Sequence, residues 1–228
     1  MKRVIGNIPV VGKVARSLYH KWFKPSKPFT NSQDYWVERY DSGGDSGDGS
    51  YRELAKFKAE IINSFVEQNN VKTVIEYGCG DGSQLKLAQY PFYKGFDVSA
   101  KAVSMCKKTF LNDSTKAFML MDDYDSETAE LTLSLDVIYH LVEDNIFTSY
   151  MDRLFDSSEH FVIIYSSNTD ENLEGQSSHV KHRNFTKWVS DMKPRWHLMK
   201  HIPNKYPYQG DTRTGSFADF FIYEEVAS

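Results

Sequence analysis

The stretch VKTVIEYGCGDGSQL, residues 71–85, decides the fold class of this chain. It is a short β-branched run that reaches an acid at Glu76, followed by glycines at three alternating positions, Gly78, Gly80 and Gly82. A continuous apolar run of this length is typical of a strand that is buried on both faces of a sheet. The glycines permit a tight turn and let the backbone approach a ligand closely. The stretch therefore predicts a buried strand followed by a ligand-binding turn.

Helical and strand patterns alternate through the chain from residue 50 onward. Helices are predicted at 51–70, from about residue 83, and at 99–110, 143–158 and 184–192. Strands are predicted at 71–77, 93–98, 116–121, 129–135 and 160–167, with a closing pair at 196–202 and 216–225. This alternation predicts a doubly wound, Rossmann-like α/β sheet. Ligands of such sheets bind at the carboxyl ends of the strands.

The size and composition of the chain are those of a globular protein. A length of 228 residues fits one domain with an appendage. No apolar stretch is long enough for a membrane span, and the first residues lack the features of a signal peptide. The two cysteines, Cys79 and Cys106, have no metal-ligand spacing, so we expect free thiols in a reducing, cytoplasmic compartment.

The first 33 residues form a basic arm with seven Lys or Arg residues and no acid, whereas the net charge of the whole chain is −4. Apolar residues recur in this arm at helical spacing. We therefore expect an amphipathic helix and linker over residues 1–28 and the domain proper over residues 29–228. Such a helix can lie on an anionic membrane or on a partner, or it can pack on its own domain.

The glycine spacing and Glu76 together distinguish between nucleotide cofactors. The pattern is G-x-G-x-G, whereas the dinucleotide fingerprint is G-x-G-x-x-G. The carboxylate of Glu76 would repel a pyrophosphate that approached the turn. S-adenosylmethionine has no phosphate and carries a sulfonium, an ammonium and a carboxylate, so the turn favours this cofactor over NAD or ATP.

Further acids follow the next two predicted strands. Asp97, with Val98 beside it, ends the second strand, where a carboxylate can accept both ribose hydroxyls, as it also does in NAD sites. Asp122 and Asp123 follow the third strand, and one of them could bind the adenine amino group. Each of these aspartates could instead be an ordinary turn or helix cap.

Four motifs, VIEYGCGDG (74–82), GFDVS (95–99), MDD (121–123) and LTLSLDVIYHL (131–141), carry a family resemblance. In this order and spacing they resemble the class I S-adenosylmethionine-dependent methyltransferases, over about residues 50–166. The resemblance implies a seven-stranded sheet whose last strand is antiparallel. It also implies that Glu76, Gly78 and Gly80 surround the methionine part, that Asp97 holds the ribose, that Asp122 or Asp123 holds the adenine, and that Ser134 and Leu135 line the site.

A narrower likeness lies in YWVERYDSGGDSGDGSY (35–51), SLDVIYHLVED (134–144) and HVKHRNFTKWV (179–189). These segments are similar to small methyltransferases encoded beside bacterial glycosyltransferases, which modify surface sugars. The likeness implies a role in polysaccharide biosynthesis with a sugar or glycan acceptor. With such a role, the basic residues 1–24 could contact a glycosyltransferase or the inner face of the membrane.

Residues 29–50 are predicted to form a lid over the cofactor. An aromatic helix with Tyr35 is followed by a loop of glycines and serines, which could close over the site and exclude water. Arg39 could pair with the cofactor carboxylate. The alternative is an ordinary surface helix and a disordered loop.

His140, just past the fourth strand, is the candidate general base, because histidine titrates near neutrality. Asp136 could orient it or hold the acceptor. His179 and His182 are expected on the same rim and could bind the acceptor, belong to a solvated basic loop, or join Asp136 in holding a divalent metal ion. His140 could also be a purely structural histidine.

The sequence therefore predicts an S-adenosylmethionine-dependent O-methyltransferase that acts on a sugar hydroxyl. A phenol, amine or lipid acceptor would keep the same chemistry with another pocket. The sequence also leaves open an NAD-dependent oxidoreductase and a non-catalytic cofactor-binding module. A nucleic acid is not expected as a substrate, because the chain beyond the basic arm is acidic and would repel a phosphate backbone.

Overall fold

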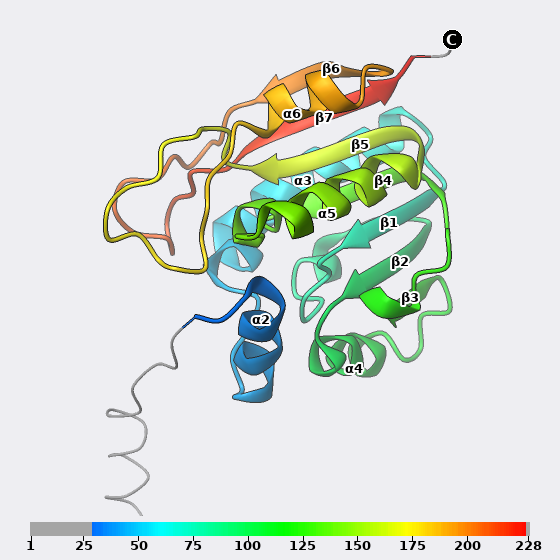
Figure 1. Cartoon of the computed structure of the whole chain (residues 1–228). Coiled ribbons are helices and arrows are strands. Elements are labelled where there is room, and N and C mark those ends of the chain that lie inside the picture. The colour runs from blue at the N-terminus through cyan, green and yellow to red at the C-terminus, as the bar shows by residue number, and fades with distance from the viewer. Residues whose placement is uncertain (1–28, 227–228) are drawn as a thin grey trace, which may run out of the picture.

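The computed structural model describes residues 29–226, and the basic helix expected within residues 1–28 lies outside them. In the described part of the chain, a seven-stranded sheet lies between helices, with the strand order β3-β2-β1-β4-β5-β7-β6 (Figure 1). The strands are β1 Thr73–Tyr77, β2 Phe92–Asp97, β3 Lys116–Leu120, β4 Ala129–Leu135, β5 Ser158–Ser166, β6 Trp196–Ile202 and β7 Asp219–Glu225.

The central strands are parallel and the last strand is not. β1 pairs in parallel with β2 and with β4, so that Val74 lies opposite both Tyr93 and Leu131. β7 runs antiparallel between β5 and β6. The predicted Rossmann-like sheet with an antiparallel last strand is therefore confirmed.

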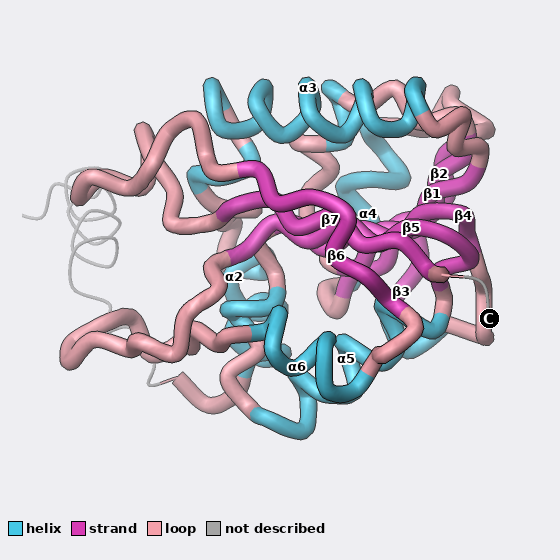
Figure 2. The backbone as a smooth tube through the Cα atoms, turned by 90° about the horizontal axis from the view of Figure 1, so that it is seen from above, coloured by secondary structure: helices cyan, strands magenta, loops and turns pink. Residues whose placement is uncertain are grey.

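The helices are α2 Ser32–Asp41, α3 Arg52–Gln68, α4 Ala100–Thr109, α5 Asp144–Asp156 and α6 Phe185–Met192. Figure 2 shows α3 on one side of the strands and α5 with α6 on the other. Successive strand residues point to opposite faces. Val74 therefore packs in the core under α3 and α4, whereas Ile75 packs in the core under α5 and α6. None of the helices within residues 29–226 is long and apolar enough to cross a membrane.

The helix predicted from about residue 83 is wrong. The chain forms only a short 3₁₀ turn, Leu85–Leu87, before β2 begins at Phe92. The α3 residue Asn63 holds this segment, because its side chain donates to the Leu87 carbonyl and accepts from the Gln89 amide, both at 2.9 Å. A connection this short, with Pro91 directly before β2, leaves no room for a helix that runs back along the sheet.

Candidate functional site

A cavity of about 540 Å³ lies at the carboxyl ends of β1, β2 and β4. Figure 1 shows α2, in blue, at the arrowhead ends of β1 and β2. The cavity wall combines the glycine turn, the ends of the strands, the lid segment and α3. Its lining residues include Trp36, Tyr40, Ser46, Lys58, Glu76, Gly78, Gly80, Asp97, Val98, Leu135, Asp136 and His140.

The glycines of the turn have left-handed backbone conformations and different surroundings. A Cβ on Gly78 (φ +86°) would lie 2.5 Å from a methyl group of Val137, and one on Gly80 (φ +57°) would lie 2.3 Å from the Ser46 hydroxyl. Gly82 does not line the cavity. Its Cβ would instead meet Phe110 at 2.9 Å. Gly78 and Gly80 therefore shape the cavity, while Gly82 lets the turn pack against α4.

Two buried carboxyl groups lie beside the turn. Glu76 accepts a hydrogen bond from the Tyr93 hydroxyl at 2.7 Å, and burial raises the pKa of Glu76 to about 7. Asp97 accepts hydrogen bonds from the amides of Gly80 and Ser99, each at 2.9 Å, and burial raises the pKa of Asp97 to about 6. The raised pKa values mean that the partners of these two groups compensate the negative charge only in part. The site can therefore stabilise a cationic ligand.

The segment over residues 29–50 covers the turn. Trp36 and Tyr40 of α2 line the cavity, and the Tyr40 hydroxyl bonds to the Ser46 hydroxyl at 2.8 Å. Ser46 in turn bonds to the backbone amide of Asp81 at 2.9 Å. Tyr51 also donates to the Asp81 carboxylate, at 2.5 Å. The lid segment is thus hydrogen-bonded to the loop that carries the glycines.

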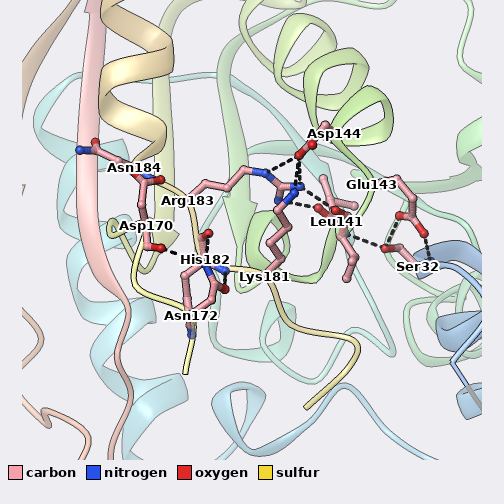
Figure 3. Close-up of polar contacts among 11 residues, drawn as sticks. Ser32, Leu141, Glu143, Asp144, Asp170, Asn172, Lys181, His182, Arg183 and Asn184 are labelled. Atoms are coloured by element: carbon pink, nitrogen blue, oxygen red, sulfur yellow. Dashed lines mark hydrogen bonds and ion pairs between the residues drawn. The ribbon is translucent and has the colours of Figure 1, made fainter. Parts of the chain in front are cut away.

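The start of α2 is anchored to the segment between β4 and α5 (Figure 3). Both the amide and the hydroxyl of Ser32 donate to the Glu143 carboxylate, at 3.0 and 2.6 Å. Arg183 supports the same rim, because its guanidinium donates to the carbonyls of Leu141 and Val142 and pairs with Asp144. These contacts bring the lid, the segment after β4 and the 181–184 loop together at one edge of the cavity.

Asp136 lies at the centre of a buried polar group of side chains. It has a left-handed backbone conformation (φ +60°), which is unusual for a residue other than glycine. Its carboxylate is 2.6 Å from the Lys58 ammonium and 2.8 Å from the Tyr139 hydroxyl. Lys58 was not predicted from the sequence. A detectable signal existed, because Lys58 lies four residues after Leu54 and four before Ile62, in the buried stripe of α3.

His140 lines the cavity as a neutral imidazole. Its Nδ1 is 2.9 Å from the carbonyl oxygen of His179. A carbonyl can only accept, so Nδ1 carries the hydrogen and Nε2 keeps its lone pair. Burial lowers the pKa of His140 to about 4. His140 is therefore uncharged at neutral pH and can accept a proton at Nε2.

Comparisons with known proteins identify the fold. No protein-family model matches the chain, and no curated protein sequence matches it. The solved structure of the N-methyltransferase NodS from Bradyrhizobium japonicum, in complex with S-adenosyl-L-homocysteine, superposes with a TM-score of 0.64 at 11% identity, over 86% of this chain and 99% of that one. The fold is that of the class I S-adenosylmethionine-dependent methyltransferases.

Two further methyltransferase structures have the same fold. Magnesium protoporphyrin IX methyltransferase from Synechocystis, with bound S-adenosylmethionine, has a TM-score of 0.61 at 14% identity, over 88% of this chain and 100% of that chain. The methyltransferase domain of bacterial CtHen1 has a TM-score of 0.58 at 18% identity, over 75% and 97% of the two chains. The predicted methyltransferase fold is thus confirmed.

Two residues of the lid that were predicted to contact the cofactor, Tyr35 and Arg39, do not line the cavity. Arg39 pairs with the Asp45 carboxylate at 3.0 Å and donates to the Asp45 carbonyl at 2.6 Å. Tyr35 stacks on the ring of His179, with centroids 4.2 Å apart. The geometry therefore offers no support for the pairing of Arg39 with a cofactor carboxylate, which stays a prediction.

The residues predicted at the adenine end are only partly in contact with the cavity. Asp122 and Asp123 lie in a 3₁₀ turn after β3, and of that turn Met121 alone lines the cavity. Ser134 is buried below the site, where it accepts a hydrogen bond from Tyr150 at 2.8 Å, while Leu135 lines the cavity. The adenine role of either aspartate stays a prediction.

The metal alternative has no ligand set in the described residues. Asp136 is paired with Lys58, His179 is stacked on Tyr35, and His182 is 2.7 Å from the Ser167 hydroxyl. Within residues 29–226 no three His, Cys, Asp or Glu side chains lie close enough to hold a metal ion. The fold brings His140 and His179 together, with ring centroids 5.3 Å apart, but it places His182 on a second cavity.

Proposed function

We propose that this protein is a methyltransferase that uses S-adenosylmethionine. The observation that carries the proposal is the joint placement of the glycine turn, Glu76 and Asp97 on one cavity of a class I methyltransferase fold. The residues fit the cofactor, because Glu76 can pair with its ammonium and Asp97 can accept from its ribose hydroxyls. Because Gly78 and Gly80 lack a Cβ, Val137 and the lid residue Ser46 can pack directly against the turn that lines this cavity.

The same cavity disfavours a dinucleotide. Acidic side chains line it at Glu76, Asp97 and Asp136. Lys58 is the sole lysine or arginine among the described residues of its wall, and this lysine is already paired with Asp136. A pyrophosphate would bring at least two negative charges against these carboxylates, with only this paired lysine to offset them. The NAD-dependent alternative is therefore the weaker one.

We propose a sugar hydroxyl as the acceptor. The cavity wall near His140 and the start of the lid carries five polar side chains beside the apolar Leu141 and Ile146: Asn31, Gln33, Asp34, Glu143 and Asn145. Amides and carboxylates of this kind bond to hydroxyl groups, and the ring of Trp36 can cover the apolar face of a sugar. This composition suits a polyhydroxylated acceptor better than an apolar lipid.

The chain contributes alignment and proton removal to the proposed reaction. The bound cofactor supplies an activated methyl group on its sulfonium. The lid and cavity wall hold the acceptor and exclude water, and alignment of this kind is worth effective molarities of about 10⁵–10⁸ M. Nε2 of His140 accepts the hydroxyl proton, which contributes about 10²–10⁴-fold. Alignment is therefore the larger contribution.

Two experiments test the proposed function. Calorimetric titration with S-adenosyl-L-homocysteine and with NAD⁺ is expected to show binding of the first ligand and none of the second. Incubation with methyl-labelled cofactor and matched sets of sugars, phenols and amines then identifies the acceptor class. Tighter binding of NAD⁺ would overturn the proposal, and labelling of phenols or amines alone would overturn its sugar acceptor.

The basic arm carries a separate proposal, which rests on its sequence. With seven basic residues and no acid, residues 1–33 are suited to bind an anionic membrane surface or an acidic partner such as a glycosyltransferase. Cosedimentation of the full chain with vesicles containing phosphatidylglycerol is expected to be lost on deletion of residues 1–27. Equal sedimentation of both forms would contradict the membrane role.

A further inference from the structure

Lys58 is a buried lysine that faces the proposed cofactor cavity. Its side chain is 1% exposed, although lysine is among the residues most rarely buried. Burial of an ammonium group is costly unless it is paired and hydrogen-bonded. Lys58 therefore needs partners that offset the free-energy cost of burying its charge. Those partners indicate the role of the lysine.

Contacts within the protein use only part of the hydrogen-bonding capacity of Lys58. The ammonium carries three hydrogens. One of its contacts is the salt bridge of 2.6 Å to Asp136, and its Nζ also lies over the ring of Tyr165, 5.2 Å from the centroid. We find no second hydrogen-bond acceptor for Nζ within residues 29–226. Lys58 therefore has donor capacity left on the side of the cavity that it lines.

The charges of the cavity wall make Lys58 distinctive. The acidic lining residues of the described part are Asp34, Glu76, Asp97, Asp136 and Glu143. Lys58 is the sole lysine or arginine in the same wall, and His140 is neutral because burial lowers its pKa to about 4. A ligand that brings its own carboxylate into this cavity therefore finds one cation to pair with.

The amino-acid end of the proposed cofactor is such a ligand, because it joins an ammonium and a carboxylate on one carbon. Lys58 and Glu76 offer the two complementary charges, and the positive charge of Lys58 acts on the Glu76 carboxyl. Asp136, itself fixed by the Tyr139 hydroxyl at 2.8 Å, holds the lysine in place. We infer that Lys58 binds the carboxylate of the cofactor's amino-acid end, with Asp136 as its positioning residue. This inference rests on the proposed function.

Ligand truncation combined with mutation tests the role of Lys58. S-adenosyl-L-homocysteine carries the carboxylate, whereas 5′-methylthioadenosine keeps the nucleoside and thioether but lacks the amino acid. Lys58→Met is expected to weaken binding of the first ligand about 10- to 100-fold, the range for a hydrogen bond to a charged group, and to leave binding of the second unchanged. Decarboxylated S-adenosylmethionine, which keeps the ammonium, is expected to show no loss of affinity in Lys58→Met at an alkaline pH that keeps Glu76 ionised in both forms.

A matched control and a second variant keep the test decisive. Lys56→Met changes an exposed lysine of the same helix, paired with Glu53, and is expected to leave the affinity for every ligand unchanged. The double variant Lys58→Met/Asp136→Asn removes both buried charges, so it does not leave an unpaired carboxylate to destabilise the fold. It is expected to show the same selective loss.

The outcomes separate this inference from the proposed function. If the unmodified protein binds neither S-adenosyl-L-homocysteine nor S-adenosylmethionine, the proposed function itself is wrong. If it binds them and the Lys58 variants bind all ligands as tightly as before, or lose all of them equally, the assignment of Lys58 to the carboxylate is wrong.

Discussion

The backbone amide of Gly80 donates a hydrogen bond of 2.9 Å to the Asp97 carboxylate. This bond joins the turn after β1 to the end of β2, so the two motifs that suggested a cofactor site form one unit. The other carboxylate oxygen accepts from Ser99 at the start of α4. Asp97 is thus held rigidly at the cavity, which is the arrangement that precise binding of a ribose requires.

Replacement of Asp97 is expected to impair cofactor binding. Asp97→Ala removes the acceptor for the Gly80 amide and the proposed acceptor for the ribose hydroxyls, so we expect the affinity for S-adenosyl-L-homocysteine to fall at least about 10-fold. Titration calorimetry measures this affinity. Asp122→Asn and Asp123→Asn serve as comparisons, because these acids do not line the cavity. A loss of affinity in either of them equal to that of Asp97→Ala would support the predicted adenine role of that aspartate.

Gly80→Ala is expected to block the site. The new Cβ would lie 2.3 Å from the Ser46 hydroxyl and 2.9 Å from that of Tyr40, which displaces the lid from the turn. The left-handed backbone adds a strain of about 1–3 kcal/mol. Gly175→Ala is the matched control, because Gly175 has a similar conformation (φ +84°) with no atom within 4 Å of the new Cβ. Both variants should unfold at a lower urea concentration than the unmodified protein, and Gly80→Ala alone should bind the cofactor more weakly.

Cofactor affinity is expected to depend on pH through Glu76. The pKa of Glu76 is about 7 in the ligand-free protein, and pairing with an ammonium requires the ionised form. Affinity should therefore fall as pH drops below 7, about 10-fold for each unit well below that value. Calorimetry between pH 5.5 and 8 measures this. In Glu76→Gln the cofactor affinity should depend less on pH below pH 7. If that variant keeps the same pH dependence, another group must cause it.

The same raised pKa predicts how stability changes with pH. Between the ordinary value of 4.5 and about 7, the folded state binds more protons at Glu76 than the unfolded state does. The free energy of unfolding of the ligand-free protein should therefore receive a contribution that falls as pH rises through this window. Urea denaturation at several pH values checks this contribution, which Glu76→Gln should remove.

His140 is expected to act as a base without titrating near neutrality. His140→Ala should lower kcat about 10²–10⁴-fold while cofactor affinity stays nearly unchanged. With the pKa of His140 near 4, kcat at saturating cofactor should show no loss near pH 6.5 from this group and should fall only toward pH 4. His160→Ala, on an exposed part of β5, is the control. Full activity of His140→Ala would place the base elsewhere.

The anchor between Ser32 and Glu143 is expected to keep the lid in place. Ser32→Ala removes the 2.6 Å hydrogen bond to Glu143 and the bond from the Val142 amide at 2.9 Å. Hydrogen exchange of the α2 amides should become faster, and the KM for the acceptor should rise more than the Kd for the cofactor. Ser64→Ala, at an exposed position on α3, should leave both unchanged. Unaltered exchange in α2 would show that other contacts hold the lid.

The local sequence pattern predicted most strands and helices, because each of them buries one or both faces and its apolar residues recur at the matching spacing. The run 71–77 has no polar alternation and contains β1, an inner strand of the sheet, and Ser99 caps α4 as expected by accepting from the Ala102 amide. The prediction of a helix from about residue 83 was wrong. Side-chain bonds from Asn63 of α3, together with Pro91 and the early start of β2, leave only a short 3₁₀ turn there.

Patterns among neighbouring residues were enough to predict the strands, the glycine turn, and the placing of Glu76 and Asp97 at strand ends. Only the folded chain shows that Lys58, 78 positions before Asp136, pairs with it, and that His140 is buried with a lowered pKa. Such properties arise from side chains that meet only after the helices pack on the sheet. Burial and charge pairing depend on all neighbours in space, and most of those neighbours cannot be identified from spacing along the sequence.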